Sequence, residues 1–156
     1  MVETPKPECV ILVGLPGAGK STFARLHFAA HDYISKDALP KAGNKQARQD
    51  AALRASLQAG RSVVVDNTHV SPAERAAVIS IAREFGARVV GYYIAATTRE
   101  AVARNEGRIG RARVPKVAIF TCAKRLAAPV LAEGFDAVHT LRVVDGRFEA
   151  QPANSG

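Results

Sequence analysis

Short apolar segments alternate with longer amphipathic ones along this chain. Residues 9–13 form an unbroken apolar run, which is typical of a strand buried on both faces of a parallel sheet. Because strand and helix patterns alternate, we expect one α/β domain over residues 1–150, with a mostly parallel sheet covered by helices on both faces. Further strands are predicted at 32–35, 61–66, 87–95 and 138–144, and helices from the glycine-rich loop to about 30 and over 44–59, 71–86, 98–107 and 115–127.

Turn and cap residues mark where these elements begin and end. Ser71 is followed three residues later by Glu74, a capping-box arrangement that starts a helix. Thr98 is the expected cap of the next helix, and Asp145-Gly146 predicts a two-residue hairpin turn. The segment 107–114 has glycines and arginines without an apolar period, so we expect a mobile loop there.

The composition is ordinary for a soluble globular protein, and we expect the protein to be cytoplasmic. Of the 156 residues, 47% are hydrophobic and 23% are charged, and no apolar run approaches the roughly 20 residues that a membrane helix needs. The polar N-terminal segment does not resemble a secretory signal. Cys9 and Cys122 are too few for a disulfide framework and are expected to be buried free thiols in a reducing cytoplasm. Residues 151–156 are expected to form a disordered tail.

The net charge of +8 fits either a solubility surface or a polyanionic ligand. The distribution favours phosphate binding, although a nucleoside triphosphate alone accounts for part of it. Only 6% of the residues are aromatic and tryptophan is absent, which argues against base stacking along a long single strand. Between residues 99 and 125 only two glutamates oppose the basic residues, which are Arg99, Arg104, Arg108, Arg111, Arg113, Lys116, Lys124 and Arg125.

The clearest motif is the loop Gly14–Ser21, which fits the Walker A pattern G-x-x-x-x-G-K-[ST]. An apolar strand precedes it and a helical pattern follows, as that motif requires. Its glycines let backbone N–H groups face phosphate oxygens, and the helix N-terminus adds partial positive charge. Lys20 is expected to reach the β- and γ-phosphates, and Ser21 to ligate Mg²⁺. The predicted NTP contacts in this loop are Gly14, Pro16, Gly17, Ala18, Gly19, Lys20, Ser21 and Thr22.

Two aspartates follow predicted strands at the same edge of the sheet. Asp37 comes just after the second strand, where a carboxylate suits the general base of phosphoryl transfer, or alternatively a helix cap or a surface acid. Asp66 ends the third strand in a Walker B arrangement, which positions Mg²⁺ or its waters, and it is the alternative base. Asn67 and Thr68 either hydrogen-bond the acceptor or shape the turn. His69 is interpreted as structural rather than catalytic.

Arg104 and Arg108 are four residues apart in a predicted helix that runs into the glycine-containing loop. That spacing places both on one helical face. We expect them to belong to a lid that closes over the nucleotide phosphates, where an arginine accelerates transfer. The alternative is a solvated basic face. Arg111 and Arg113 lie further along the loop, and both roles stay open for them.

Taken together, these motifs resemble the kinase domain of the polynucleotide 5′-kinases, especially that of the eukaryotic polynucleotide kinase 3′-phosphatases. Many families share the P-loop, whereas the Asp-Asn-Thr strand end and the Ala-Glu-Gly-Phe segment are much narrower features. The matching stretches run in order along most of the chain, over 13–23, 35–37, 65–68, 104–108, 114–115 and 129–135.

The resemblance implies a P-loop kinase fold with about five parallel strands and an arginine-bearing lid. It also implies Mg²⁺-dependent transfer of the γ-phosphate of ATP, or of another NTP, to a 5′-hydroxyl end of DNA or RNA. The residues carried over are Asp37 as the general base, Lys20 and Ser21 as phosphate and Mg²⁺ contacts, Asp66 as the active-site acid at the strand end, and Arg104 and Arg108 as the lid arginines.

Two positions depart from the family's pattern. His69 stands where the family commonly has asparagine, and Pro40 stands where phage-type members have an arginine that grips the acceptor's first phosphate. Lys41, Lys45 and Arg48 are candidates to replace that arginine. The Asp-x-Asp-x-Thr motif of the phosphatase partner is absent from the sequence, so we expect separate phosphatase or ligase partners if repair needs those activities.

Two other functions stay open. A small-molecule or nucleoside kinase of the same P-loop class would keep Lys20, Ser21 and Asp37 and would close its lid over a small acceptor. A nucleotide-dependent switch would carry a base-specificity motif such as Asn-Lys-x-Asp, which this sequence lacks.

Overall fold

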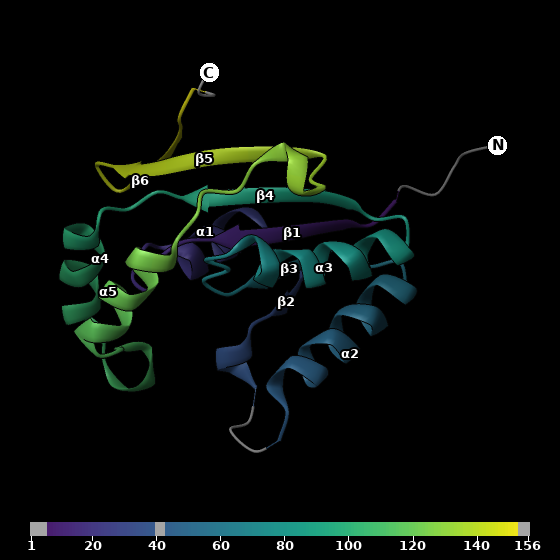
Figure 1. Ribbon diagram of the computed structural model, residues 1–156, viewed down its shortest axis with the longest axis horizontal. Coiled ribbons are helices and arrows are strands. Elements are labelled where there is room, and N and C mark those ends of the chain that lie inside the picture. Colours follow the sequence, from purple (N-terminus) through teal and green to yellow (C-terminus); the bar gives the residue numbers. More distant parts are fainter. Residues whose placement is uncertain (1–5, 40–42, 153–156) are drawn as a thin grey trace.

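The computed structural model describes residues 6–39 and 43–152. Its strands are β1 (Glu8–Val13), β2 (Asp32–Ile34), β3 (Val63–Asp66), β4 (Arg88–Ile94), β5 (Ala137–Val144) and β6 (Arg147–Ala150). They form one sheet in the order β2-β3-β1-β4-β5-β6 (Figure 1). The first five strands are parallel and β6 runs antiparallel to β5, so both the predicted parallel sheet and the predicted C-terminal hairpin are confirmed.

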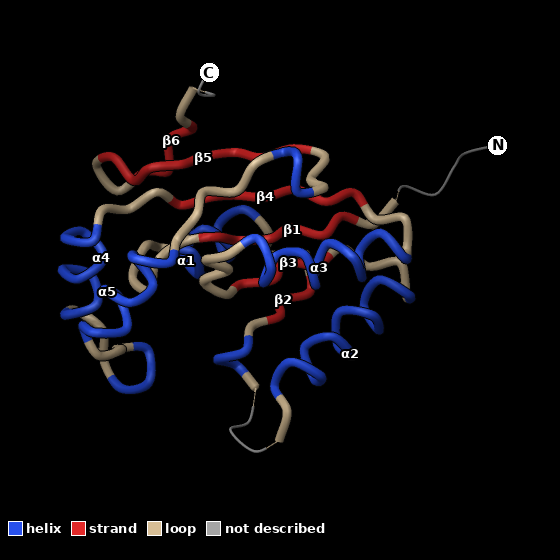
Figure 2. The backbone as a smooth tube through the Cα atoms, in the orientation of Figure 1, coloured by secondary structure: helices blue, strands red, loops and turns tan. Residues whose placement is uncertain are grey.

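Helices cover both faces of this sheet (Figure 2). The helices are α1 (Lys20–His27), α2 (Lys45–Gln58), α3 (Pro72–Glu84), α4 (Thr98–Glu106) and α5 (Lys116–Arg125), with 3₁₀ turns η1 (Lys36–Ala38), η2 (Gly110–Ala112) and η3 (Leu131–Glu133). One core layer holds apolar side chains of α2 and α3, and the other holds those of α1, α4 and α5. Within the described ranges, no helix has the length and apolar character needed to span a bilayer.

The central strand β1 explains the unbroken apolar run in the sequence. All five residues of Cys9–Val13 are fully buried. Cys9, Ile11 and Val13 belong to the core layer under α2 and α3, whereas Val10 and Leu12 belong to the opposite layer. Because successive side chains of a strand point to opposite faces, a strand covered on both faces needs apolar residues at every position.

Helices α3 and α4 begin with capping boxes, and the cap of α4 lies one residue earlier than predicted. The hydroxyl of Ser71 accepts a hydrogen bond from the backbone N–H of Glu74, as expected. For α4, the cap is Thr97 rather than Thr98, because Thr97 lies three residues before Glu100 and the two residues cap each other's backbone N–H groups. The Glu partner therefore decides between two adjacent threonines.

The end of helix α1 and the C-terminal segment differ in detail from the predictions. Helix α1 ends at His27 instead of near residue 30, because Phe28 leaves the helix and packs its ring against Phe23. The N–H of Gln151 donates to the Thr140 carbonyl, so the chain stays attached to the sheet beyond β6, and residues 153–156 of the predicted tail lie outside the described residues. Both cysteines are free thiols.

Cys9 is fully buried, and burial raises the pKa of its thiol to about 12. Cys122 is only partly buried, which corrects the expectation of two buried thiols. Its helix α5 lies at the edge of the core layer, where Cys122 packs against the cluster without being enclosed by it.

A buried ion pair connects α3 to the segment that carries the Ala-Glu-Gly-Phe motif. Arg75 has no exposed surface, and its Nε and Nη2 donate to the two carboxylate oxygens of Glu133 at 2.7 and 2.9 Å. Its Nη1 donates to the carbonyls of His69 and Ala127 at 2.8 and 3.0 Å. The guanidinium is therefore paired both by charge and by hydrogen bonds, which is what makes burial of an arginine tolerable.

We expect Arg75→Met to lower the free energy of unfolding by about 3–5 kcal/mol, because the change leaves the Glu133 carboxylate without its charged partner and two carbonyls without their donor. The matched control is Arg54→Met, which removes an exposed ion pair with Glu84 and should have little effect on stability. Urea unfolding of both variants measures the difference. Equal effects of the two changes would contradict a central role for the buried pair.

Candidate active site

The Walker A loop connects the buried end of β1 to the first turn of α1. Gly19 caps the helix with a left-handed backbone and no side-chain cap, so the first N–H groups of α1 stay available to an anion. Gly17 has a φ of 86°, and a Cβ at this position would lie 2.5 Å from the Ala101 carbonyl of α4. Both the conformation and this close approach require glycine at position 17.

The side chain of Lys20 folds back onto the Walker A loop. Its Nζ donates to the carbonyls of Gly14 and Leu15 at 3.0 and 2.9 Å, and the side chain is 8% exposed. Burial lowers the pKa of Lys20 to about 8, with Asp66 opposing and Arg108 adding to this shift. The predicted phosphate-binding cation is therefore in the loop, as the motif requires.

Asp66 accepts hydrogen bonds from two hydroxyl groups, one in the Walker A loop and one on β2. Its Oδ2 accepts hydrogen bonds from Ser21 Oγ at 2.8 Å and from the Tyr33 hydroxyl at 2.5 Å. A serine hydroxyl beside a carboxylate suits Mg²⁺, which takes one or two protein oxygens and completes its shell with phosphate and water. Within residues 6–39 and 43–152, no group of three or more His, Cys, Asp or Glu side chains forms an all-protein cage. The predicted pair Ser21 and Asp66 therefore fits Mg²⁺ on a nucleotide.

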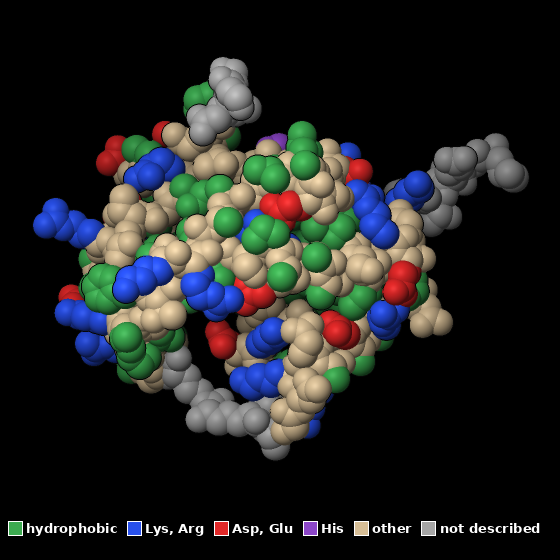
Figure 3. Space-filling view, viewed as in Figure 1, with side chains coloured by type: hydrophobic (Ala, Val, Ile, Leu, Met, Phe, Trp, Pro, Cys, Tyr) green, Lys and Arg blue, Asp and Glu red, His purple; other side chains and the backbone are tan. Residues whose placement is uncertain are grey.

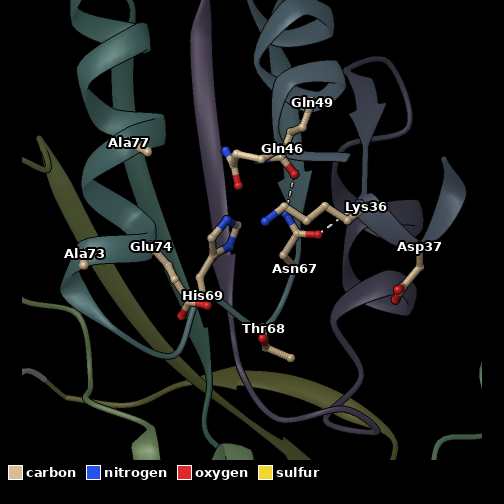
Figure 4. A pocket seen from close by; sticks show the side chains of 10 residues that line it. All are labelled: Lys36, Asp37, Gln46, Gln49, Asn67, Thr68, His69, Ala73, Glu74 and Ala77. Carbon is tan, nitrogen blue, oxygen red and sulfur yellow. Dashed lines mark hydrogen bonds between the residues drawn. The ribbon is translucent and has the colours of Figure 1, made fainter. Parts of the chain in front are cut away.

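Two cavities meet at the carboxyl edge of the sheet. The first, of about 650 Å³, is lined by P-loop residues together with Asp66 and Arg108. The second, of about 460 Å³, lies between α2, α3 and the ends of β2 and β3 (Figure 4). Asp37, Asn67 and Thr68 line both cavities. These three residues therefore form the boundary between a phosphate site and a neighbouring polar pocket.

Asp37 is exposed and lies on η1 at this boundary. Ser35, not Asp37, caps the turn, because the Ser35 hydroxyl accepts from the Asp37 N–H. The helix-cap alternative for Asp37 is therefore wrong. What distinguishes this acid from a general surface acid is its place between the two cavities.

Asn67 orders the floor of the second cavity. Its Oδ1 accepts from the Lys36 N–H at 3.0 Å, and its Nδ2 donates to Gln49 Oε1 at 2.7 Å. One amide therefore links the end of β3 to η1 and to α2. Of the two functions that the sequence left open for Asn67, shaping the local structure is confirmed, and a contact to the acceptor stays a prediction.

The two lid arginines occupy different places, which corrects the expectation of one helical face. Helix α4 ends at Glu106, so Arg108 lies beyond it and lines the phosphate cavity, with its guanidinium donating to the Ala112 carbonyl at 3.2 Å. Arg104 instead donates from Nη1 to the Ala18 carbonyl at 2.5 Å and lies against the P-loop. Gly107 is the C-cap of α4, so the helix ends between the two arginines.

Two hydrogen bonds join the ends of the segment 105–114, which connects α4 to α5. The buried side chain of Asn105 donates to the Val114 carbonyl at 2.6 Å and accepts from the Val114 N–H at 2.8 Å. The intervening residues include the η2 turn, so the predicted loop at 107–114 contains a short 3₁₀ helix. This amide clamp fixes both ends of the segment beside the phosphate cavity.

Of the basic residues proposed to replace the family arginine, the two that the structure describes do not line the second cavity. Pro40 and Lys41 lie outside the described residues. Lys45 and Arg48 are on α2 but contribute nothing to the lining, where Gln46 and Gln49 stand instead. Sequence reasoning missed these glutamines, as well as Tyr33. Gln49 is 2% exposed, and a glutamine on the buried side of a helix was the available signal.

Known proteins match this chain in sequence. A sequence model of the family described as AAA domain matches residues 9–129. The bifunctional polynucleotide phosphatase/kinase of Schizosaccharomyces pombe (strain 972 / ATCC 24843) is 32% identical over 133 residues, which cover 82% of this chain and 32% of that protein. The chain therefore spans about a third of the length of this relative.

Solved structures share the fold. A chain of the Pnkp1/Rnl/Hen1 RNA repair complex matches with a TM-score of 0.66 and 25% identity, over 80% of this chain and 45% of that one. A gluconokinase from Sinorhizobium meliloti 1021 matches with a TM-score of 0.59 and 19% identity, over 96% and 86% of the two chains, which shows the fold alone. Since the family model covers most of its length and kinases share its sheet and helices, the chain belongs to the AAA domain family and is a P-loop kinase domain.

Proposed function

We propose that this P-loop kinase domain transfers the γ-phosphate of an NTP to the 5′-hydroxyl end of a nucleic acid. One observation carries the proposal: Asp37 lies on the boundary between the phosphate cavity and the polar pocket. A base at that position is next to both reactants. The relative in Schizosaccharomyces pombe is named a polynucleotide phosphatase/kinase, which supports this acceptor over others.

On the donor side, the chain supplies positive charge and hydrogen-bond donors. The N–H groups at the start of α1, the Lys20 ammonium and the Arg108 guanidinium all border the cavity that would hold the phosphates. Ser21 and Asp66 would hold Mg²⁺, which would neutralise part of the charge of the nucleotide phosphates. Tyr33 donates to Asp66 and so fixes the direction of its carboxylate.

On the acceptor side, Asp37 would accept the proton of the attacking hydroxyl. Asn67 holds the backbone of Lys36, the residue before Asp37, so the base is positioned from the end of β3. Such positioning matters because phosphoryl transfer depends mainly on alignment and on electrostatic stabilisation of the transferring group. Arg108 would meet the charge that develops on that group.

The charged surface supports a polyanionic acceptor. Figure 3 shows Lys and Arg side chains, with some acidic ones among them, around the hollow that separates the α4 and α5 side of the molecule from the α2 side. A strand whose 5′-end reaches Asp37 would bring its own phosphates past this surface. The Pnkp1 match comes from an RNA repair complex, and we extend the proposal to repair partners that act with this domain on the same ends.

A small-molecule kinase is the second candidate, because a gluconokinase shares the fold over most of both chains. It would use the same Lys20, Ser21 and Asp37. The two candidates differ in the acceptor alone, which makes an acceptor comparison the decisive experiment.

We expect Asp37→Asn to leave NTP affinity unchanged and to lower turnover by roughly 10²–10⁴, because it removes the base and no donor contact. Lys20→Ala should weaken both NTP binding and turnover. Asp145→Asn, the same change in the exposed β5–β6 turn, is the control and should keep normal activity. Calorimetric NTP titrations and steady-state rates give the two readouts. Near-normal turnover of Asp37→Asn would make Asp66 the candidate base.

We expect Arg108→Ala to reduce kcat more than it weakens NTP binding, because interactions that are strongest in the transition state act on kcat. Arg88→Ala, at the opposite edge of the sheet, is the matched control and should change neither quantity. Rates at saturating NTP, set beside NTP dissociation constants, separate the two effects. Equal and small losses in both would make Arg108 a surface charge.

The acceptor comparison uses a 5′-hydroxyl oligonucleotide, the matching nucleoside and gluconate, with radiolabelled γ-phosphate and increasing salt. We expect the oligonucleotide to give the highest kcat/KM and the only marked salt dependence, with a log–log slope of about −0.7 for each phosphate neutralised on a single strand. A nucleoside or gluconate used as efficiently as the oligonucleotide would replace the proposed function with that of a small-molecule kinase.

A further inference from the structure

His69 is held in one orientation by the fold. Its backbone has a φ of 47°, and its Nδ1 lies 2.7 Å from the Leu12 carbonyl. A carbonyl only accepts, so the proton is on Nδ1 and Nε2 carries a lone pair. Burial lowers the pKa of the ring to about 4, which keeps His69 neutral at physiological pH. Arg75 donates to the His69 carbonyl and so fixes the backbone as well.

His69 is buried, with only 4% of its surface exposed. Its Nε2 atom nevertheless has no hydrogen-bond partner among the described residues. Figure 4 shows the imidazole pointing into the pocket, toward the side chains of Gln46 and Lys36. A buried acceptor without a donor costs free energy, and native proteins retain few of them. This atom is therefore a place where a ligand donor would be favoured.

Several other acceptors on the pocket wall are already engaged within the protein, whereas Gln46 and Thr68 keep acceptors that are open to solvent. Asn67 Oδ1 and Gln49 Oε1 accept from within the protein. Glu74 accepts from the backbone and hydroxyl of Ser71. The charged side chains on the wall are one lysine and two acids, namely Lys36, Asp37 and Glu74.

A phosphate group would meet this net negative wall and the lone pair of His69, and it could donate nothing to either. A neutral group with a hydroxyl or amino hydrogen would satisfy Nε2 without that repulsion. The cavity of about 460 Å³ is in the size range of small-molecule sites, and Asp37 lies at its boundary with the phosphate cavity. The pocket therefore suits an uncharged unit directly attached to the reacting hydroxyl.

We propose that His69 determines acceptor specificity: its Nε2 accepts a hydrogen bond from a hydroxyl or amino group of the terminal nucleoside, which occupies the pocket while the strand's phosphates stay outside. This inference rests on the proposed function and names the part of the acceptor that the pocket recognises. The donor is either the ribose 2′-hydroxyl or an exocyclic amino group of the terminal base.

The test compares His69→Asn with the wild-type protein. Asparagine tolerates a positive φ, and its Nδ2 can replace Nδ1 as the donor to Leu12, whereas nothing replaces Nε2. The acceptors are matched 5′-hydroxyl oligonucleotides whose terminal nucleotide is ribo or deoxyribo and carries adenine or unsubstituted purine. His139→Asn, on β5, is the control for the same change outside the site.

We expect wild-type kcat/KM to be roughly 3- to 10-fold higher for acceptors with the recognised donor, as one hydrogen bond allows, and mainly through KM. In His69→Asn this preference should fall to near 1, with NTP affinity little changed. The acceptor pair that shows the loss identifies the donor as 2′-hydroxyl or amino. His69→Gln, which restores an acceptor atom near the position of Nε2, should recover part of the preference.

Two outcomes would overturn the inference: a wild-type protein indifferent to both donors, or a preference that persists in His69→Asn. If His69→Asn does not fold, the ¹⁵N resonance of Nε2 in the wild-type protein decides. It should shift on addition of the donor-bearing oligonucleotide and stay in place with the donor-lacking one, and equal shifts overturn the inference. Failure of the proposed function is distinct, because then no oligonucleotide is phosphorylated at all.

Discussion

The turn that follows β3 is the constraint on which the site depends. Its three successive carbonyls, at positions 68, 69 and 70, accept hydrogen bonds from Gly14 of the P-loop, Arg75 of α3 and Ala127 after α5. These donors come from three segments that are far apart in the sequence. Because each buried carbonyl needs a donor, moving the turn would leave several polar groups unpaired at once. The turn is therefore rigid, and the P-loop is attached to it directly.

This attachment couples the two cavities. Asp66 precedes the turn and orients Ser21 on the donor side, and Asn67 begins the turn and holds η1, which carries Asp37, on the acceptor side. Adjacent residues of one strand end therefore position both the proposed Mg²⁺ ligands and the proposed base. An alignment error of 1 Å in phosphoryl transfer can cost about 10² in rate, so a shared rigid element is more valuable here than two independent ones.

The features that the sequence predicted correctly are those set by residues close together in the chain. The P-loop between an apolar strand and a helix, the strand end at Asp66 and the hairpin at 145–146 follow from spacing within a few residues. The sequence did not predict that Arg75 pairs with Glu133 or that Tyr33 reaches Asp66, since these contacts join segments that only the fold brings together. The error over Arg108 had a different origin, because an i, i+4 rule was applied across a helix end.

The two cavities differ in charge, and the net positive charge of the whole chain does not show this difference. The phosphate cavity is bordered by Lys20, Arg25 and Arg108 against two aspartates, whereas the polar pocket has a single lysine and two acids. An excess of positive charge over the whole chain therefore does not describe the acceptor pocket. If the acceptor is a nucleic acid, its phosphates gain from lying along the basic outer surface and lose by entering the pocket. Electrostatics then favours one orientation, with an uncharged end inward at Asp37 and the strand outward, and the unpaired lone pair of His69 favours the same orientation.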